Sequence, residues 1–229
     1  MKRKITILTI AFLSSMLMYA NAFAAATGRC GDSITWTLDD SGNLTLSGSG
    51  EMWNNGYDDS PFKDYEIRKA TVKYGITSIG ESAFLGCRGM TELTLPNSVT
   101  SIADDAFHGC RGLTELTLPN SVTSIGDGAF SGCSGLTELT LPDSVASIGD
   151  GAFIYCSGLS KITSLAEIPP VCGSGVFDRV NKTNCELIVP EGSVAAYTRA
   201  EVWNEFSSIR GFPGVEVTVA DKTRKIVVE

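Results

Sequence analysis

Residues 78–100 read SIGESAFLGCRGMTELTLPNSVT, residues 101–123 read SIADDAFHGCRGLTELTLPNSVT, and residues 124–146 read SIGDGAFSGCSGLTELTLPDSVA. A fourth copy, SIGDGAFIYCSGLSKIT, starts at Ser147, so successive copies start 23 residues apart. A fixed internal period of this length is typical of a solenoid, in which each repeat forms one coil.

Apolar residues recur at the same positions of each repeat. The main columns are Ile79, Ile102, Ile125 and Ile148; Phe84, Phe107, Phe130 and Phe153; and Leu93, Leu116, Leu139 and Ile162. One repeat buries about six such side chains, worth about 12 kcal/mol. Ordering its backbone costs about 1–2 kcal/mol per residue, which is more. A single repeat therefore cannot fold, whereas stacked repeats cover one another's apolar faces.

Each repeat contains a predicted strand and a predicted turn. In TELTLP, Leu93 and Leu95 alternate with Glu92 and Thr94, so the leucines point inward and the polar residues outward. Pro96 lacks an amide donor and ends the strand. In GDGAFSGC an aspartate stands where a helix would have its N-cap, which predicts a short helical or 3₁₀ turn on the convex side.

The pattern L-x-L-P-x-x-V-x-x-I-G-x-x-A-F-x-x-C-x-x-L over residues 67–190 resembles the BspA-like, or Treponema pallidum-type, leucine-rich repeats of bacterial surface proteins. The resemblance implies a leucine-rich-repeat solenoid of the β-rich α/β class, a right-handed curved stack of 23-residue repeats with parallel strands. It also implies adhesion or binding without catalysis, and it carries over no particular ligand.

Both ends of such a stack need a cap, because each exposes an apolar face and a strand edge. Alternating apolar residues around DDSGN predict a β-hairpin as the N-terminal cap. An irregular helical stripe predicts a short helical C-terminal cap; it consists of Tyr197, Trp203, Phe206 and Ile209. The expected divisions are residues 1–24 (signal peptide), 25–66 (N-terminal cap), 67–190 (repeats), 191–210 (C-terminal cap) and 211–229 (a hairpin, or a tail toward further sequence).

The N-terminus has the layout of a secretory signal peptide, with MKRK, an apolar stretch and small residues near Ala24. The apolar stretch of about 15 residues is shorter than the roughly 20 that a membrane-spanning helix needs. We therefore expect an exported chain, secreted, periplasmic or attached to the cell surface, with no transmembrane segment after cleavage. The net charge of −8 argues against a nucleic-acid partner, which would require clustered Lys and Arg.

Four of the seven cysteines share one column of the repeat, namely Cys87, Cys110, Cys133 and Cys156. Parallel side chains in a straight row cannot surround a tetrahedral zinc ion and are poorly placed for disulfides, so a buried ladder of free thiols is predicted. Cys172 and Cys185 lie outside that column. In an exported protein they could form a disulfide or remain free, and the sequence leaves both alternatives open.

Catalytic chemistry has few candidates in this sequence. His108 is the only histidine, and it occupies a variable column of the repeat, which argues against a general base. The glycine-rich stretches 47–50 and 172–175 lack the Lys-Ser/Thr of a phosphate loop and are predicted to be turns. We therefore expect no enzyme, no cofactor and no metal site.

The outward positions of the predicted strands form two columns. They are Lys69, Glu92, Glu115, Glu138 and Lys161, and beside them Thr71, Thr94, Thr117, Thr140 and Thr163. Stacked carboxylates repel one another, so the first column is either an acidic stripe for a basic partner or cation, or a copied solvated face. A second acidic column is predicted to cap the turns; it consists of Glu81, Asp104, Asp127 and Asp150.

The predicted function is therefore that of a non-enzymatic, exported adhesion or protein-interaction module, a monomer that binds a protein or glycan on an external surface through its concave strand face. The alternative is a structural spacer or a fragment of a larger surface protein.

Overall fold

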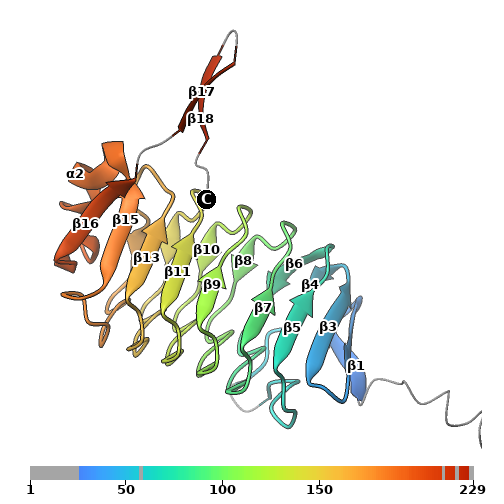
Figure 1. The fold of residues 1–229 in the computed structure, drawn as a ribbon. Helices are drawn as coiled ribbons and strands as arrows, with labels where there is room; N and C mark the ends of the chain where they lie inside the picture. Colours follow the sequence, from blue (N-terminus) through green and yellow to red (C-terminus); the bar gives the residue numbers. More distant parts are fainter. Residues whose placement is uncertain (1–25, 57–58, 213–214, 220–221, 227–229) are drawn as a thin grey trace, which may run out of the picture.

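The computed structural model describes residues 26–56, 59–212, 215–219 and 222–226. The chain winds into a stack of coils, with the first strands at one end and the last elements of the stack at the other (Figure 1). The predicted signal peptide, residues 1–24, lies outside the described residues.

Each coil contributes strands to two parallel rows. The wider row consists of β3 (Asn43–Gly48), β5 (Lys69–Val72), β7 (Glu92–Thr94), β9 (Glu115–Thr117), β11 (Glu138–Leu141), β13 (Lys161–Ser164) and β15 (Glu186–Pro190). The narrower row consists of β4 (Gly50–Glu51), β6 (Ile76–Ile79), β8 (Ser101–Ile102), β10 (Ser124–Ile125), β12 (Ser147–Ile148) and β14 (Val171–Cys172). Ile125 is in register with Ile102 and Ile148, so the stack follows the repeat period.

The segments predicted to be short helical or 3₁₀ turns are instead successive turns without a helix, and that prediction was wrong. Their amides bond alternately within and between coils. The Ala83 N–H donates to the Gly80 carbonyl at 3.2 Å, whereas the Phe84 N–H donates to the Ala106 carbonyl of the next coil at 2.7 Å. A helix would keep every such bond within its own segment. The turns therefore extend the backbone ladder between coils.

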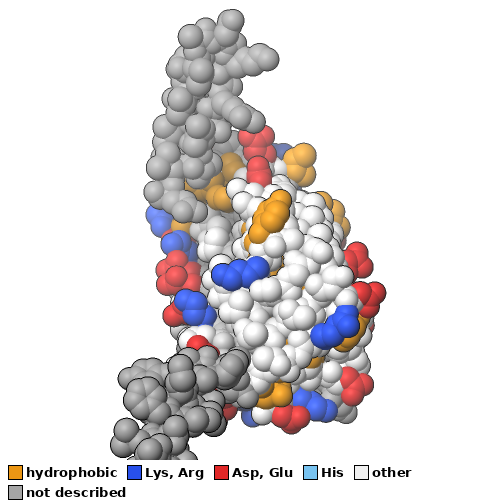
Figure 2. Space-filling model, turned by 90° about the vertical axis from the view of Figure 1, so that its right-hand side faces the viewer, with side chains coloured by type: hydrophobic (Ala, Val, Ile, Leu, Met, Phe, Trp, Pro, Cys, Tyr) orange, Lys and Arg blue, Asp and Glu red, His pale blue; other side chains and the backbone are white. Residues whose placement is uncertain are grey.

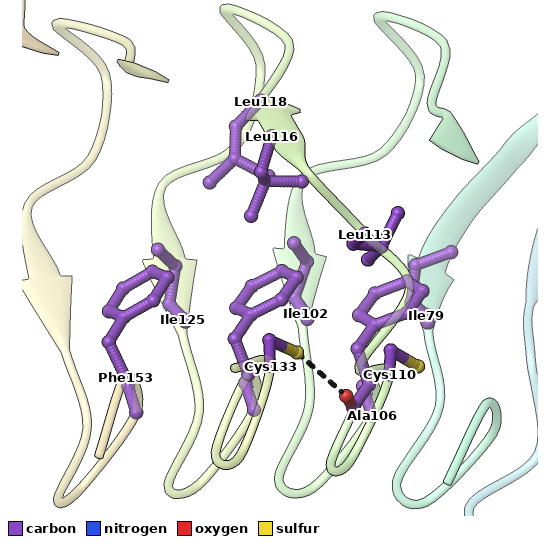
Figure 3. Close-up of a cluster of buried hydrophobic side chains, with 14 of the residues drawn as sticks. Ile79, Ile102, Ala106, Cys110, Leu113, Leu116, Leu118, Ile125, Cys133 and Phe153 are labelled. Carbon is purple, nitrogen blue, oxygen red and sulfur yellow. Dashed lines mark hydrogen bonds between the residues drawn. The ribbon is translucent and has the colours of Figure 1, made fainter. Parts of the chain in front are cut away.

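The core contains the predicted row of phenylalanines. Adjacent ring centroids are 4.9 Å apart for Phe84 and Phe107, 5.1 Å for Phe107 and Phe130, and 5.3 Å for Phe130 and Phe153. The rings are nearly parallel, and all four side chains are fully buried. Figure 3 shows the isoleucines of the narrower row on one side of these rings. The prediction that side chains 23 residues apart meet as rows is confirmed.

The predicted thiol ladder lies beside the phenylalanine row. Cys110 Sγ donates to the Phe84 carbonyl at 3.2 Å. Cys133 Sγ donates to the Phe107 carbonyl at 3.3 Å, the bond dashed in Figure 3. Burial raises the pKa of the Cys87 and Cys133 thiols to about 12. A protonated thiol is a weak nucleophile and metal ligand, so this column serves packing.

The three aspartates of the second acidic column cap backbone groups, as predicted, but from one coil to the next, whereas the Glu81 side chain caps no amide among the described residues. Asp104 Oδ1 accepts from the Asp127 N–H at 2.8 Å, and Asp127 Oδ1 accepts from the Asp150 N–H at 2.7 Å. The aspartates therefore form a hydrogen-bonded ladder parallel to the stack axis.

This ladder predicts that Gly126→Ala destabilises the protein by about 1–3 kcal/mol. A Cβ at position 126 would lie 2.4 Å from Asp104 Oδ1 and 2.7 Å from both the Ala103 carbonyl carbon and the Asp104 nitrogen. Because two of these atoms belong to the backbone, the coil itself would have to move. Urea denaturation checks the effect against Gly192→Ala, where a Cβ meets nothing within 4 Å. Equal midpoints for the two variants would contradict the prediction.

The N-terminal cap contains the predicted hairpin of β2 (Ile34–Leu38) and β3. A further strand not predicted from the sequence, β1 (Ala26–Gly31), pairs antiparallel with β2. Figure 2 looks onto the end of the molecule at which β1 lies, where uncharged polar side chains and backbone predominate and hydrophobic side chains are isolated. The cap thus replaces an apolar coil surface with a polar one.

The C-terminal cap consists of η1 (Glu191–Ser193), α2 (Val194–Tyr197), η2 (Trp203–Glu205) and β16 (Ser208–Phe212). Trp203, Tyr197 and Phe206 are buried, as predicted for the cap. Ile209 was wrongly assigned to the helical stripe, because it lies in β16, in register with Leu187 of β15. Beyond the cap, β17 (Val215–Val219) and β18 (Lys222–Ile226) form an antiparallel hairpin, one of the two predicted alternatives for this segment.

Candidate functional site

Strands β5, β7, β9, β11, β13 and β15 follow one another along one side of the stack (Figure 1), and we call the surface formed by their outward side chains the strand face. Burial alternates along the strands. In β11, Leu139 and Leu141 are buried, whereas Glu138 is exposed and Thr140 is half-buried. The structure places all ten residues of the two predicted outward columns on this face; they are Lys69, Glu92, Glu115, Glu138, Lys161, Thr71, Thr94, Thr117, Thr140 and Thr163.

The lysines at the two ends of the charged column neutralise two of its three carboxylates. Lys69 Nζ lies 2.6 Å from Glu92 Oε2, and Lys161 Nζ lies 3.0 Å from Glu138 Oε2. In the described part of the chain, Glu115 forms no ion pair. The column is therefore a ladder of mixed charge with one unpaired acid near its middle.

The hydrogen-bonded ladder of the strand face is interrupted between β7 and β9. Glu115 is in register with Glu138, and Glu92 is in register with Lys69, but among the described strands β7 does not pair with β9. Leu93 is correspondingly only half-buried, whereas Leu116 and Leu139 are buried. The expectation that all three carboxylates stack in one regular ladder thus holds for Glu115 and Glu138 and fails between Glu92 and Glu115.

Two groups of repeat threonines differ in their hydrogen bonds. The hydroxyls of Thr91, Thr100, Thr123 and Thr137, at the coil edges, donate to a carbonyl of the preceding coil, as Thr137 Oγ1 does to the Thr114 carbonyl at 2.9 Å. By contrast, the five hydroxyls of the strand face make no hydrogen bond to any other residue that the structure describes. The column from Thr71 to Thr163 therefore presents a row of hydroxyl donors and acceptors to solvent.

Two charged positions at the C-terminal end of this face were not predicted from the sequence. Glu186 of β15 is in register with Lys161, and Arg210 of β16 forms an ion pair with Glu186. The register step from Lys161 to Glu186 is 25 residues, because the last coil contains two additional residues. That insertion removes Glu186 from the 23-residue column, although the degenerate last repeat signalled that another strand follows.

The other chemical candidates are placed as follows. His108 is half-buried, with Nδ1 3.2 Å from Asp105 Oδ1. Cys172 and Cys185 are free thiols, and the disulfide considered from the sequence is not formed; Cys172 ends β14 in the narrower row, whereas Cys185 precedes β15 in the wider one. Within the described ranges, no group of three or more His, Cys, Asp or Glu is placed to hold a metal ion.

No helix in the residues that the structure describes has the length and apolarity required to span a membrane.

Comparisons with known proteins agree with this architecture. A family model described as "BspA type Leucine rich repeat region" matches residues 57–183 in six copies. The crystal structure of the T. pallidum leucine-rich repeat protein is similar over 67% of this chain and 91% of its own, at 21% identity and a TM-score of 0.49. That of a leucine-rich repeat protein from Eubacterium ventriosum is similar over 81% and 68%, at 20% identity and a TM-score of 0.51, and this likeness shows the fold. Among curated proteins, no sequence matches the chain.

Proposed function

Since the chain belongs to the BspA-type leucine-rich repeat family, whose model covers residues 57–183, we propose that it is a non-enzymatic protein-interaction module. The sequence at its N-terminus, typical of a signal peptide, favours an exported module that acts at or beyond the cell surface. We propose the strand face as the surface that binds the partner, with the partner a protein.

The observation that carries this proposal is the difference between the two groups of threonines. The hydroxyls of Thr91, Thr100, Thr123 and Thr137 are used within the fold, whereas those of the five strand-face threonines have no hydrogen-bond partner in the described chain. Solvent-facing hydroxyls in register, beside charges of both signs, can form many hydrogen bonds with an extended partner at little desolvation cost.

The mixed charge of the strand face also bears on the kind of partner. Two of the three carboxylates have lysine partners, so little negative potential remains to attract a strongly basic ligand. Glu115 supplies one unpaired acid for a single basic side chain. We therefore propose a partner with a mixed polar surface in place of the basic partner considered for a purely acidic stripe.

The test compares two double variants of equal charge. Thr94→Arg/Thr117→Arg places two long cations on the strand face, whereas Asn97→Arg/Asn120→Arg places them at exposed turn positions that follow β7 and β9. The wild-type chain is applied to an array of purified extracellular matrix and cell-surface proteins. For every protein that it binds, we expect the threonine variant to weaken binding about tenfold or more and the asparagine variant to leave it nearly unchanged.

Two results would contradict this proposal. Equal effects of the two variants would place the interaction elsewhere on the stack. Absence of binding to every protein of the array would favour the alternative function of a structural spacer, which requires no ligand.

A further inference from the structure

A depression of about 490 Å³ lies where the chain enters β5 and β7. Its volume lies within the range of small-ligand sites. One wall is the segment that leads into β5, and the other is the turn that leads into β7. The lining residues are Tyr65, Glu66, Ile67, Arg68, Gly86, Cys87, Arg88, Gly89 and Thr91.

At one column of this lining the two coils are farther apart than at the same column of the following coils. Glycines of the same column in the following coils lie against the preceding backbone, and a Cβ at Gly112 or Gly135 would come within 2.8 or 2.2 Å of the Arg88 or Arg111 carbonyl oxygen. At Gly89 the nearest atom would be the Ile67 carbonyl oxygen at 3.4 Å. The segment 65–68 belongs to the half repeat before the first complete one, so the regular contact is lost.

Two arginines stand at this opening. Arg68 and Arg88 are both exposed, and neither forms an ion pair with any carboxylate that the structure describes. Glu66 is the only acid of the lining and leaves the depression with one net positive charge. In a chain with 26 acids and 18 bases, a lining that holds two arginines without ion pairs and one acid is a local reversal of charge.

An aromatic ring completes the lining. Tyr65 is 40% exposed, and its ring packs edge-on against Trp36, with centroids 5.4 Å apart and planes at 68°. Trp36 is itself buried and packs edge-on against Phe62 at 5.6 Å. The phenol ring is therefore held in place by the N-terminal cap and offers a fixed, partly apolar surface beside the arginines.

We propose that this depression binds an anionic sugar residue of a glycan. Guanidinium groups donate paired hydrogen bonds to a carboxylate or a sulfate, and the fixed phenol ring offers an apolar surface to the C–H face of a sugar ring. A short depression between two coils fits a single ring better than an extended acidic peptide, which would need a groove or a strand edge. This proposal does not depend on the strand face, so each can fail without the other.

The experiment measures binding to the full chain by calorimetry at physiological ionic strength. The probes are a heparin octasaccharide, which carries both sulfates and carboxylates, a hyaluronan octasaccharide, which carries only carboxylates, an uncharged cello-oligosaccharide, and a glutamate octapeptide. We expect binding of at least one of the two anionic glycans. Binding of hyaluronan would show that a carboxylate suffices, whereas binding of heparin alone would identify sulfate as the recognised group. The uncharged sugar and the peptide should bind at least about tenfold more weakly.

Variants assign the binding to the depression. Arg68→Gln, Arg88→Gln and Tyr65→Ala should each weaken glycan binding about tenfold. The matched control is Arg111→Gln, because Arg111 occupies the same column as Arg88 one coil later, is equally exposed, and lies outside the lining. It should change the dissociation constant less than about threefold.

Several outcomes would overturn the proposal. The first is an equal loss of glycan binding for Arg88→Gln and Arg111→Gln, which would indicate diffuse electrostatic attraction. The second is binding of the glutamate peptide that is as tight as binding of the glycans. The third is the absence of glycan binding at millimolar concentration. If Tyr65→Ala or Arg68→Gln disturbs folding, the pair at positions 88 and 111 still decides, since both side chains are exposed on turns.

Discussion

Phe107→Ala is expected to lower the free energy of unfolding by about 3–5 kcal/mol. The ring is fully buried, with its centroid 4.9 Å from that of Phe84 and 5.1 Å from that of Phe130. Truncation removes the buried area and both stacking contacts and leaves a cavity in the middle of the stack, where neighbouring coils are held in position by the backbone ladder and cannot collapse into it.

The measurement is urea denaturation followed by circular dichroism, with the wild-type chain and Tyr74→Ala in parallel. Tyr74 is 80% exposed, so its truncation removes an aromatic ring of similar size from the surface and should cost little. A midpoint for Phe107→Ala close to that of Tyr74→Ala would contradict the inward placement of the phenylalanine row. Loss of stability with an unchanged slope is the expected signature of a cavity in an otherwise intact fold.

The repeat period predicted most of the fold because it indicates both which side chains of neighbouring coils touch and, with the alternation within each repeat, which of them point inward. A residue such as Ile125 has the same neighbours one period before and after it, so the sequence itself specifies which side chains touch. The alternation around Leu139 then decides which of them point inward. Family likeness added the architecture, but the rows of Phe, Ile and Cys follow from spacing alone.

The predictions that were wrong concern segments whose backbone hydrogen bonds go to a neighbouring coil, because the local sequence does not show that partner. The aspartate of GDGAFSGC has the identity of a helix N-cap, yet Asp127 caps an amide of the next coil. Ile209 fits a helical stripe, yet it pairs with β15 as a strand. In both cases a partner from a neighbouring coil takes the bond that local spacing would assign to a helix, and no short-range pattern contains that partner.

The candidate sites were predicted unequally for the same reason. The strand face repeats with the period, so its columns are visible in the sequence. The depression beside Arg88 lies between segment 65–68 and the turn one period later, and the wider spacing at Gly89 that accompanies it is not visible in the sequence. Similarly, the interruption between β7 and β9 separates two repeats of nearly identical sequence and has no signal in them.

Trp203→Ala is expected to lower the free energy of unfolding by about 3–5 kcal/mol as well, through a different element of the fold. Trp203 is fully buried in the C-terminal cap, and its ring centroid lies 5.4 Å from those of Phe177 and Tyr197. Its Nε1 donates to the Pro170 carbonyl at 2.9 Å. The substitution therefore opens a cavity beside Phe177, the last phenylalanine of the row. It also removes the hydrogen-bond donor to the Pro170 carbonyl, which lies in the loop between β13 and β14.

Two further variants separate these contributions, again by urea denaturation. Trp203→Phe retains an aromatic ring but lacks the indole N–H, so it should show a smaller loss, of which about 1–2 kcal/mol reflects the hydrogen bond. Trp53→Ala is the control, because Trp53 is 42% exposed and its Nε1 bonds to Asp32 at the surface. A loss at Trp203 no larger than that at Trp53 would mean that the stack is stable without its cap. Because each coil is stabilised chiefly by its neighbours, an uncapped Phe177 should instead allow unfolding to start from the C-terminal end.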